Sequence, residues 1–206
     1  NRLDAAYVER LTISGKKMYT NGSTLWVTQD EATWTRHTTD GTTWSDEAFK
    51  ADFILQGLDG ELVYAAGATF TPGGTYDTET IGDTNSTITE LQWFKDKFWI
   101  GKPEGLWSWN PVDQKVKPEF DVLEAINDDN FSHMCVHRGL LYFNIYNRLY
   151  FTDGTRFSEI YPQELSGFTS MDYIVPTFGP LLVGASMKLG WHGEDSKYKI
   201  ATASPG

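Results

Sequence analysis

The chain has 206 residues, of which 40% are hydrophobic and 22% charged, a composition typical of a globular protein rather than a disordered one. Its net charge is −11, and a domain this acidic repels phosphate backbones, which argues against direct nucleic-acid binding. No apolar run approaches the roughly 18 residues that a membrane span needs, which argues against membrane insertion.

A pattern of about forty residues recurs five times along the chain. Each copy has a short apolar strand, a turn with Gly, Lys or Asp, and a second strand that is often aromatic. The first strands are predicted at residues 11–13, 53–55, 91–94, 134–136 and 174–175, and the second strands hold Tyr19, Tyr64, Trp99, Tyr142 and Leu182. Further short strands follow polar turns, for example at residues 105–109 and 115–117.

This organisation predicts an all-β fold. A period of about forty residues with roughly four strands is that of β-propeller blades, so we expect about five blades in a single domain over residues 1–206. The approximate blades are residues 7–50, 51–90, 91–130, 131–173 and 174–206. The segment 198–203 is expected to pair with 7–13 and close the ring, and without that pairing the chain would be part of a larger propeller. A β-sandwich with similar strands is the alternative.

Two segments combine Asp, Gly and an aromatic residue in the same order, at residues 38–44 (TTDGTTW) and 152–157 (TDGTRF). In such a turn Asp accepts backbone N–H groups, Gly supplies a positive φ, and the aromatic ring packs into the core. Both segments resemble the Asp-box of sialidases and related propellers, although Gly follows Asp directly here. A weaker copy spans residues 28–34. In that family the box is a structural turn, which implies structural roles for Asp40, Gly41, Trp44, Asp153, Gly154 and Phe157.

The sequence contains no pattern that points clearly to catalysis or metal binding, so we expect a protein that is not an enzyme. His133, Cys135 and His137 are zinc-competent residue types, but alternate strand positions lie about 6.6 Å apart, which is wide for one ion. A glycoside hydrolase with Glu61, Asp96 or Asp172 as its carboxylates is an alternative. No catalytic residue, metal site or cofactor is therefore predicted.

Eight Trp residues could serve packing or sugar binding. Trp107 and Trp109 lie two residues apart on one strand, so their rings share a face. Packing between blades is the expected role of most Trp side chains, and Trp107 and Trp109 are the candidates for stacking on a glycan.

The style of the repeats, most of all in residues 147–160 and 106–111, resembles propeller domains of bacteriophage tail and adhesion proteins. Short-tailed phage nozzle proteins carry such propellers in a ring around the tail channel. The resemblance implies a structural component of the virion tail that contacts other virion proteins and further copies of itself in a homo-oligomeric ring. A receptor-recognition propeller that binds a cell-surface glycan, located on the virion or otherwise extracellular, is the alternative.

Overall fold

The structure is a computed structural model that describes residues 15–29, 35–57, 60–121, 131–145, 148–160, 173–175, 181–185, 188–192 and 198–202. The regular elements in these residues are twenty β-strands, and the predicted all-β class is confirmed. Among the described residues, no helix is long and apolar enough to cross a bilayer.

The strands form five four-stranded antiparallel sheets, and within each sheet the strands are neighbours in chain order. The first sheet holds β1 (Gly15–Thr20), β2 (Leu25–Gln29), β3 (Arg36–Thr38) and β4 (Ser45–Asp46), and the second β5 (Phe53–Gln56), β6 (Leu62–Ala66), β7 (Thr69–Thr71) and β8 (Glu79–Thr80). The third holds β9 (Glu90–Phe94), β10 (Lys97–Lys102), β11 (Gly105–Asn110) and β12 (Lys115–Asp121), and the fourth β13 (Phe131–His137), β14 (Leu140–Ile145), β15 (Arg148–Thr152) and β16 (Phe157–Ile160). The fifth holds β17 (Tyr173–Val175), β18 (Leu181–Ala185), β19 (Lys188–His192) and β20 (Tyr198–Thr202).

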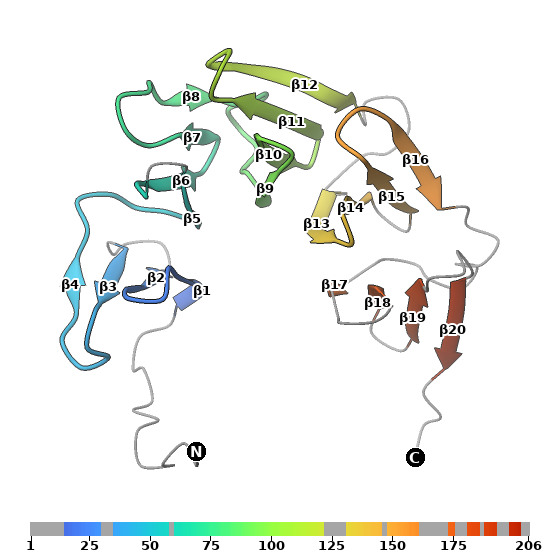
Figure 1. The fold of residues 1–206 in the computed structure, drawn as a ribbon, viewed down its shortest axis with the longest axis horizontal. Coiled ribbons are helices and arrows are strands. Elements are labelled where there is room, and N and C mark those ends of the chain that lie inside the picture. Colours follow the sequence, from blue (N-terminus) through green and yellow to red (C-terminus); the bar gives the residue numbers. More distant parts are fainter. Residues whose placement is uncertain are drawn as a thin grey trace.

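The five sheets stand side by side along an open arc, with the first and fifth sheets at its two ends (Figure 1). The first strand of each sheet, β1, β5, β9, β13 and β17, lies on the inner side of the arc, and each of these strands contacts the next. The fourth strands lie toward the outer rim. The starts of the first strands therefore gather along one inner edge.

The described sheets do not close into the predicted ring, because the first and fifth sheets stand at the two ends of the arc (Figure 1). The segment that was expected to pair with residues 7–13 is β20, and it pairs with β19 as the last strand of its own sheet. Because the fifth sheet is complete with four strands of its own, it needs no strand from the start of the chain. Residues 7–13 lie outside the described residues.

The predicted alignment of the first repeat is displaced by one strand. Tyr19 was aligned with residues of second strands, but it lies in β1, which is the innermost strand of the first sheet and contacts β5. The turn-and-aromatic pattern of residues 15–19 looks like the second strands of later repeats, and this similarity explains the error. The predicted strand at residues 11–13 lies outside the described residues.

Large side chains fill the space between neighbouring sheets. Ile54 and Trp26 are buried between the first two sheets, Phe70 and Trp109 between the second and third, and Trp99 belongs to the core shared by the third and fourth. Burying each of these side chains stabilises the fold by about 2 kcal/mol. The high aromatic content thus serves packing between sheets, because flat rings fill the wide gaps between twisted sheets.

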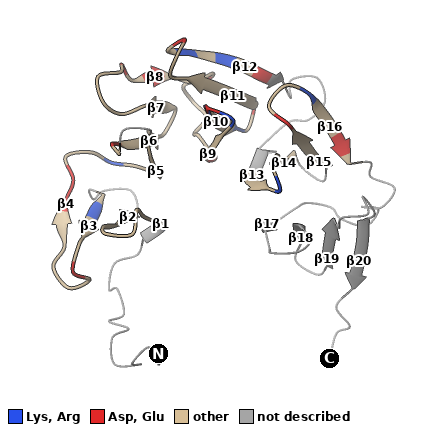
Figure 2. Ribbon diagram, viewed as in Figure 1, with Lys and Arg blue, Asp and Glu red and all other residues tan. Residues whose placement is uncertain are grey.

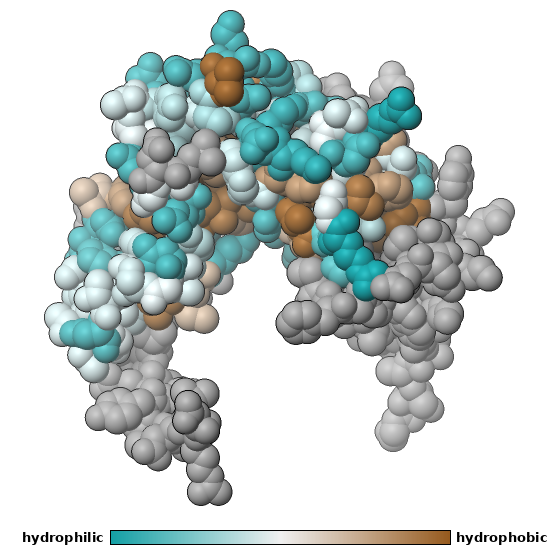
Figure 3. Space-filling view, viewed as in Figure 1, coloured by the Kyte–Doolittle hydropathy of each residue, from teal (hydrophilic) through white to brown (hydrophobic). Residues whose placement is uncertain are grey.

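Charged groups lie mainly toward the rim of the arc. The outer strand β12 carries both basic and acidic segments, and its Lys117 pairs with Asp113 at 2.6 Å (Figure 2). On the face shown in Figure 3, hydrophilic residues cover much of the outer rim, while hydrophobic residues lie further in, between the sheets. Both signs of charge therefore occur on the described part of the rim.

Candidate functional site

Four side chains from different sheets meet near the starts of the first strands. They are Lys17 on β1, Phe53 on β5, Glu90 on β9 and His133 on β13, and we call them the inner-edge cluster. The Lys17 Nζ atom lies 3.4 Å from the centroid of the Phe53 ring and 3.7 Å from Glu90 Oε1. His133 Nδ1 lies 3.6 Å from the same Glu90 oxygen. Glu90, on the third sheet, therefore contacts side chains of both the first and the fourth sheets.

A β-bulge directs Lys17 toward this cluster. The pairing of β1 with β2 shifts between Gly15 and Met18, so that two residues of β1 stand opposite Thr28. The buried Thr28 hydroxyl accepts a hydrogen bond from the Lys17 N–H at 3.0 Å and donates one to the Lys17 carbonyl at 3.4 Å. These bonds satisfy backbone groups that the bulge leaves outside the regular ladder.

Burial shifts the pKa of one side chain in the cluster and of one beside it. Burial lowers the pKa of Lys17, and the attraction of Glu90 offsets only part of that change. Burial also raises the pKa of Cys135 to about 12, and the negative charge of Glu90 adds to the effect. Because only a thiolate is a strong nucleophile, Cys135 is a packing residue in this state.

A cleft of about 200 Å³ opens beside the cluster. Its walls come from the inner strands of three sheets and include Lys17, Phe53, Glu90 and Gln92. The wall thus combines an ammonium, a carboxylate, an amide and an aromatic ring. This set offers charge, hydrogen bonds and apolar contact to a ligand, as small-molecule sites commonly do.

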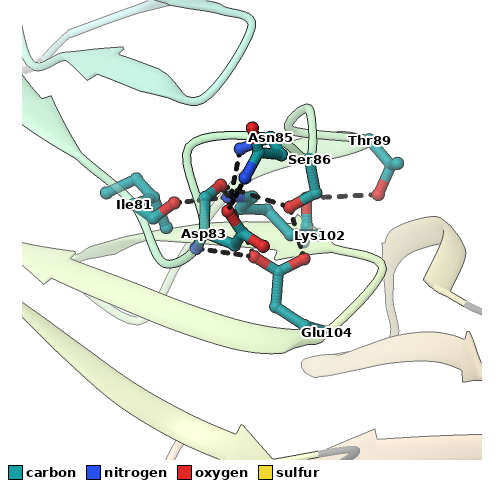
Figure 4. A network of polar contacts seen from close by, with 8 residues as sticks. Ile81, Asp83, Asn85, Ser86, Thr89, Lys102 and Glu104 are labelled. Carbon is teal, nitrogen blue, oxygen red and sulfur yellow. Dashed lines mark hydrogen bonds and ion pairs between the residues drawn. The ribbon is translucent and has the colours of Figure 1, made fainter.

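A second polar network fixes the loop that leads into Glu90 (Figure 4). The Lys102 side chain is fully buried, and its ammonium donates hydrogen bonds to the carbonyl oxygens of Ile81 and Asp83. Its third partner is Glu104 Oε1, at 2.9 Å. Burying a charge is costly unless it is paired and hydrogen-bonded, and here all three donors of the ammonium have acceptors.

Glu104 connects this lysine to the rest of the loop. Its carboxylate accepts hydrogen bonds from the Asp83 N–H at 3.0 Å and from the Ser86 hydroxyl at 2.6 Å. Burial raises the pKa of Glu104, but the hydrogen bonds from Ser86 and Lys102 outweigh it, so the pKa lies below its usual value. Gly82 makes room for this arrangement, because a Cβ there would lie 2.7 Å from Glu104 Oε1. The network therefore ties residues 81–86 of this loop to Lys102 and Glu104.

The two Asp-Gly turns predicted from the sequence lie elsewhere, between the third and fourth strands of the first and fourth sheets. Asp40 Oδ1 accepts the N–H groups of residues 42 and 43 at 2.8 and 2.7 Å, and Gly41 has φ +77°. Asp153 Oδ1 accepts the N–H groups of residues 155 and 156, both at 2.9 Å, and Gly154 has φ +97°. These bonds are those that the spacing predicts for a tight turn, and they leave both carboxylates outside the inner-edge cluster.

The aromatic residues of these two turns are both half-buried. Phe157 is half-buried and packs edge-on against Trp99, with ring centroids 6.2 Å apart. Trp44 is half-buried as well.

The sequence prediction missed a third turn of the same kind, at Asn21. The Asn21 side chain accepts the N–H groups of residues 23 and 24 at 3.1 and 2.9 Å. The shared pattern is Thr, then Asp or Asn, then Gly.

The proposed glycan-stacking role is wrong for Trp109. This side chain is only 2% exposed, and its ring packs against Phe70, Phe98 and Tyr76 between the second and third sheets. Trp107 on the same face is half-buried against the same core. Adjacent sheets cover that face of β11, so the shared orientation of the two rings indicates packing.

The carboxylates considered for a glycoside hydrolase are not brought together. Glu61 and Asp96 are exposed in the turns that follow β5 and β9, at the opposite end of these strands from the cluster. Asp172 lies outside the described residues. Of the zinc-competent residues on β13, Cys135 and His137 are buried and His133 contacts Glu90. Within the described part of the chain, no three His, Cys, Asp or Glu side chains gather as metal ligands.

Sequence reasoning missed Lys17, Phe53 and Glu90. Each occupies an early position in a first strand, and a correct alignment of the first repeat would have placed Lys17 beside the others. Their meeting could still not be predicted, because it depends on how three sheets are stacked.

Comparison with known proteins adds information on the fold alone. No family model and no curated protein matches the sequence. Among solved structures, the chain is similar to an extracellular domain assigned to a hybrid two-component system of B. thetaiotaomicron, with a TM-score of 0.68 and 13% identity over 90% of this chain and 28% of that one. It is also similar to PorZ, a surface component of the type-IX secretion system of Porphyromonas gingivalis, with a TM-score of 0.58 and 9% identity over 92% and 27% of the two chains.

A third similar structure is the CNH domain of AfRom2, with a TM-score of 0.58 and 11% identity over 91% of this chain and 70% of that one. The chain spans less than a third of the length of the extracellular domain and of PorZ. At these identities the likeness concerns the arrangement of the sheets.

Proposed function

We propose that this chain is part of a larger β-propeller, in which its five sheets are blades, and that it serves as a non-catalytic binding module. Three features support the propeller: each sheet is a four-stranded meander, the first strands lie innermost, and the five sheets follow an open arc. Because the arc is open, further sheets would be needed to complete a ring. The likeness to segments of much longer chains agrees with this arrangement.

The observation that carries the binding role is the chemistry of the inner-edge cluster. Lys17 and His133 both lie within ion-pair distance of Glu90, beside an aromatic ring and a cleft of about 200 Å³. The nearby Cys135 thiol is held protonated by burial. This arrangement provides selective contacts for a ligand, and it supplies recognition rather than a nucleophile with its base.

The experiment is a binding screen of the 206-residue protein against arrays of glycans and peptides. We expect saturable binding that Glu90→Gln weakens at least tenfold, because the change removes the negative charge that pairs with Lys17 in the wall of the cleft. Asp46→Asn is the matched control, since Asp46 pairs with Arg36 at 2.6 Å on the outer part of the first sheet. Binding that is indifferent to Glu90→Gln, or glycoside turnover that a carboxylate variant abolishes, would overturn the proposal.

A virion tail is one setting for such a module, as the resemblance of the repeats implies, and this role stays a prediction. Its test is the native mass and image of the particle that carries the chain. A ring of several copies, or an assembly with other tail proteins, is expected. The same images would show whether further four-stranded sheets complete the propeller.

A further inference from the structure

The Lys17 ammonium rests in a setting that has the features of a binding site for a cation. Its Nζ atom lies 3.4 Å from the centroid of the Phe53 ring and 3.7 Å from Glu90 Oε1. An aromatic face attracts a cation through its quadrupole, and a carboxylate attracts it through its charge. Phe53 and Glu90 come from different sheets, so the site is built by the stacking of the fold.

We propose that Phe53 and Glu90 form a binding site for a primary ammonium group, which the chain's own Lys17 occupies when no ligand is bound. The ligand class is a peptide lysine side chain or a free chain N-terminus, which share this group. The proposal rests on the proposed binding function and names the ligand class of the same surface.

Lys17 is suited to leave the site. Its side chain is 43% exposed, whereas that of Glu90 is 15% exposed, so the lysine covers the site from the solvent side. The backbone of Lys17 is fixed separately by its two hydrogen bonds with the Thr28 hydroxyl. The side chain can therefore swing away without disturbing the β1–β2 pairing.

The cleft gives space for the rest of a ligand. Lys17, Phe53 and Glu90 all line this cleft. Its volume of about 200 Å³ corresponds to that of roughly six or seven water molecules at about 30 Å³ each. A butylammonium group with part of a peptide backbone fits a space of this order. The apolar wall residues Ile54 and Leu91 would contact the methylene groups of such a ligand.

Lys17 competes with any added amine because it is tethered beside the site. An intramolecular group has an effective concentration in the millimolar range or above. If Lys17 fills the site about 90% of the time, the apparent affinity for an external ammonium falls about tenfold. Removing the Lys17 side chain should therefore raise the apparent affinity for an external ammonium about tenfold.

The test is titration calorimetry of Lys17→Ala with two probes. Nα-acetyl-lysinamide represents a peptide lysine and alaninamide represents a chain N-terminus, while the uncharged Nα-acetyl-norleucinamide is the control ligand. We expect at least one ammonium probe to bind Lys17→Ala about tenfold more tightly than the unchanged protein. Adding Glu90→Gln to Lys17→Ala should remove this gain. The probe that binds better identifies the source of the ammonium.

Lys97→Ala is the matched control variant. Lys97 also pairs with a carboxylate, Glu119 at 3.0 Å, and lies 5.5 Å from the centroid of the Trp99 ring, but it does not line the cleft. No gain of probe binding is expected from this change. An equal gain in Lys97→Ala, equal binding of the uncharged probe, or no gain in Lys17→Ala would overturn the proposal.

If Lys17→Ala fails to fold, Lys17→Gln keeps most of the side-chain stem and should show the same gain.

Two further results separate this proposal from the proposed function. Failure of the array screen together with tighter probe binding by Lys17→Ala would overturn the proposed function and keep this site. Array binding that depends on Glu90, without any gain for the probes, would overturn the ammonium site alone.

Discussion

Replacing Lys102 with Met tests whether a buried ammonium holds the loop before β9. The side chain is fully buried, and its ammonium contacts the carbonyl oxygens of Ile81 and Asp83 and the carboxylate of Glu104. Met has a similar length but offers no hydrogen-bond donor. The Lys102→Met change therefore leaves two carbonyl oxygens and one carboxylate oxygen without this partner.

The size of the effect follows from the burial of these groups. Removing one partner of a buried ion pair costs about 3–5 kcal/mol. The Glu104 side chain is 21% exposed, so water can solvate part of its charge after the change. We therefore expect a loss near the lower end, about 3 kcal/mol. For a chain of this length, that loss lowers the thermal midpoint by roughly 6–12 °C.

Thermal unfolding followed by near-ultraviolet circular dichroism measures this loss, and hydrogen exchange locates it in residues 82–89. Lys117→Met is the matched control, because Lys117 pairs with Asp113 at 2.6 Å while both side chains are largely exposed. Exposed pairs contribute little, so no measurable change is expected from it. A loss for Lys102→Met no larger than that of Lys117→Met would refute the reasoning.

Three further predictions concern residues outside this network. Hydrogen bonds from Arg156 N–H and from Thr155 hold the pKa of Asp153 at about 2, below its unfolded value near 3.9, so their stabilisation is present above about pH 4 and is lost as the pH falls to 2. Asp153→Ala should lower the thermal midpoint at pH 7, and its difference from the unchanged protein should shrink as the pH falls from 4 to 2; a difference as large at pH 2 as at pH 7 would contradict this. Cys135, whose pKa burial raises to about 12, should react with iodoacetamide at pH 8 far more slowly in the native than in the unfolded protein, as mass spectrometry can measure. Trp109→Ala should cost about 3–5 kcal/mol in urea unfolding, and a stable variant would show that its ring is not part of the core.

Much of the strand pattern was predictable because it depends on near neighbours in the sequence. Alternating apolar residues and Gly, Asp and Asn turns predict short antiparallel strands, and each of the five predicted repeats contains the whole or nearly the whole of one four-stranded sheet. The Asp153 turn is similarly local, since its carboxylate bonds residues only two and three positions ahead. Only the alignment inside the first repeat failed, because the residues around Tyr19 look like a second strand, and contact with β5 shows that they form a first strand.

The sequence alone therefore determined the all-β class, the forty-residue repeat and the chemistry of the turns, because these follow from side-chain alternation and from bonds between close neighbours. The tertiary structure decided which Trp is buried, and that Lys17 meets Phe53 and Glu90 at the inner edge. It also decided that the sheets form an open arc rather than a closed ring. These features depend on the stacking angle and spacing of whole sheets, which the sum of many side-chain contacts sets and no local pattern encodes.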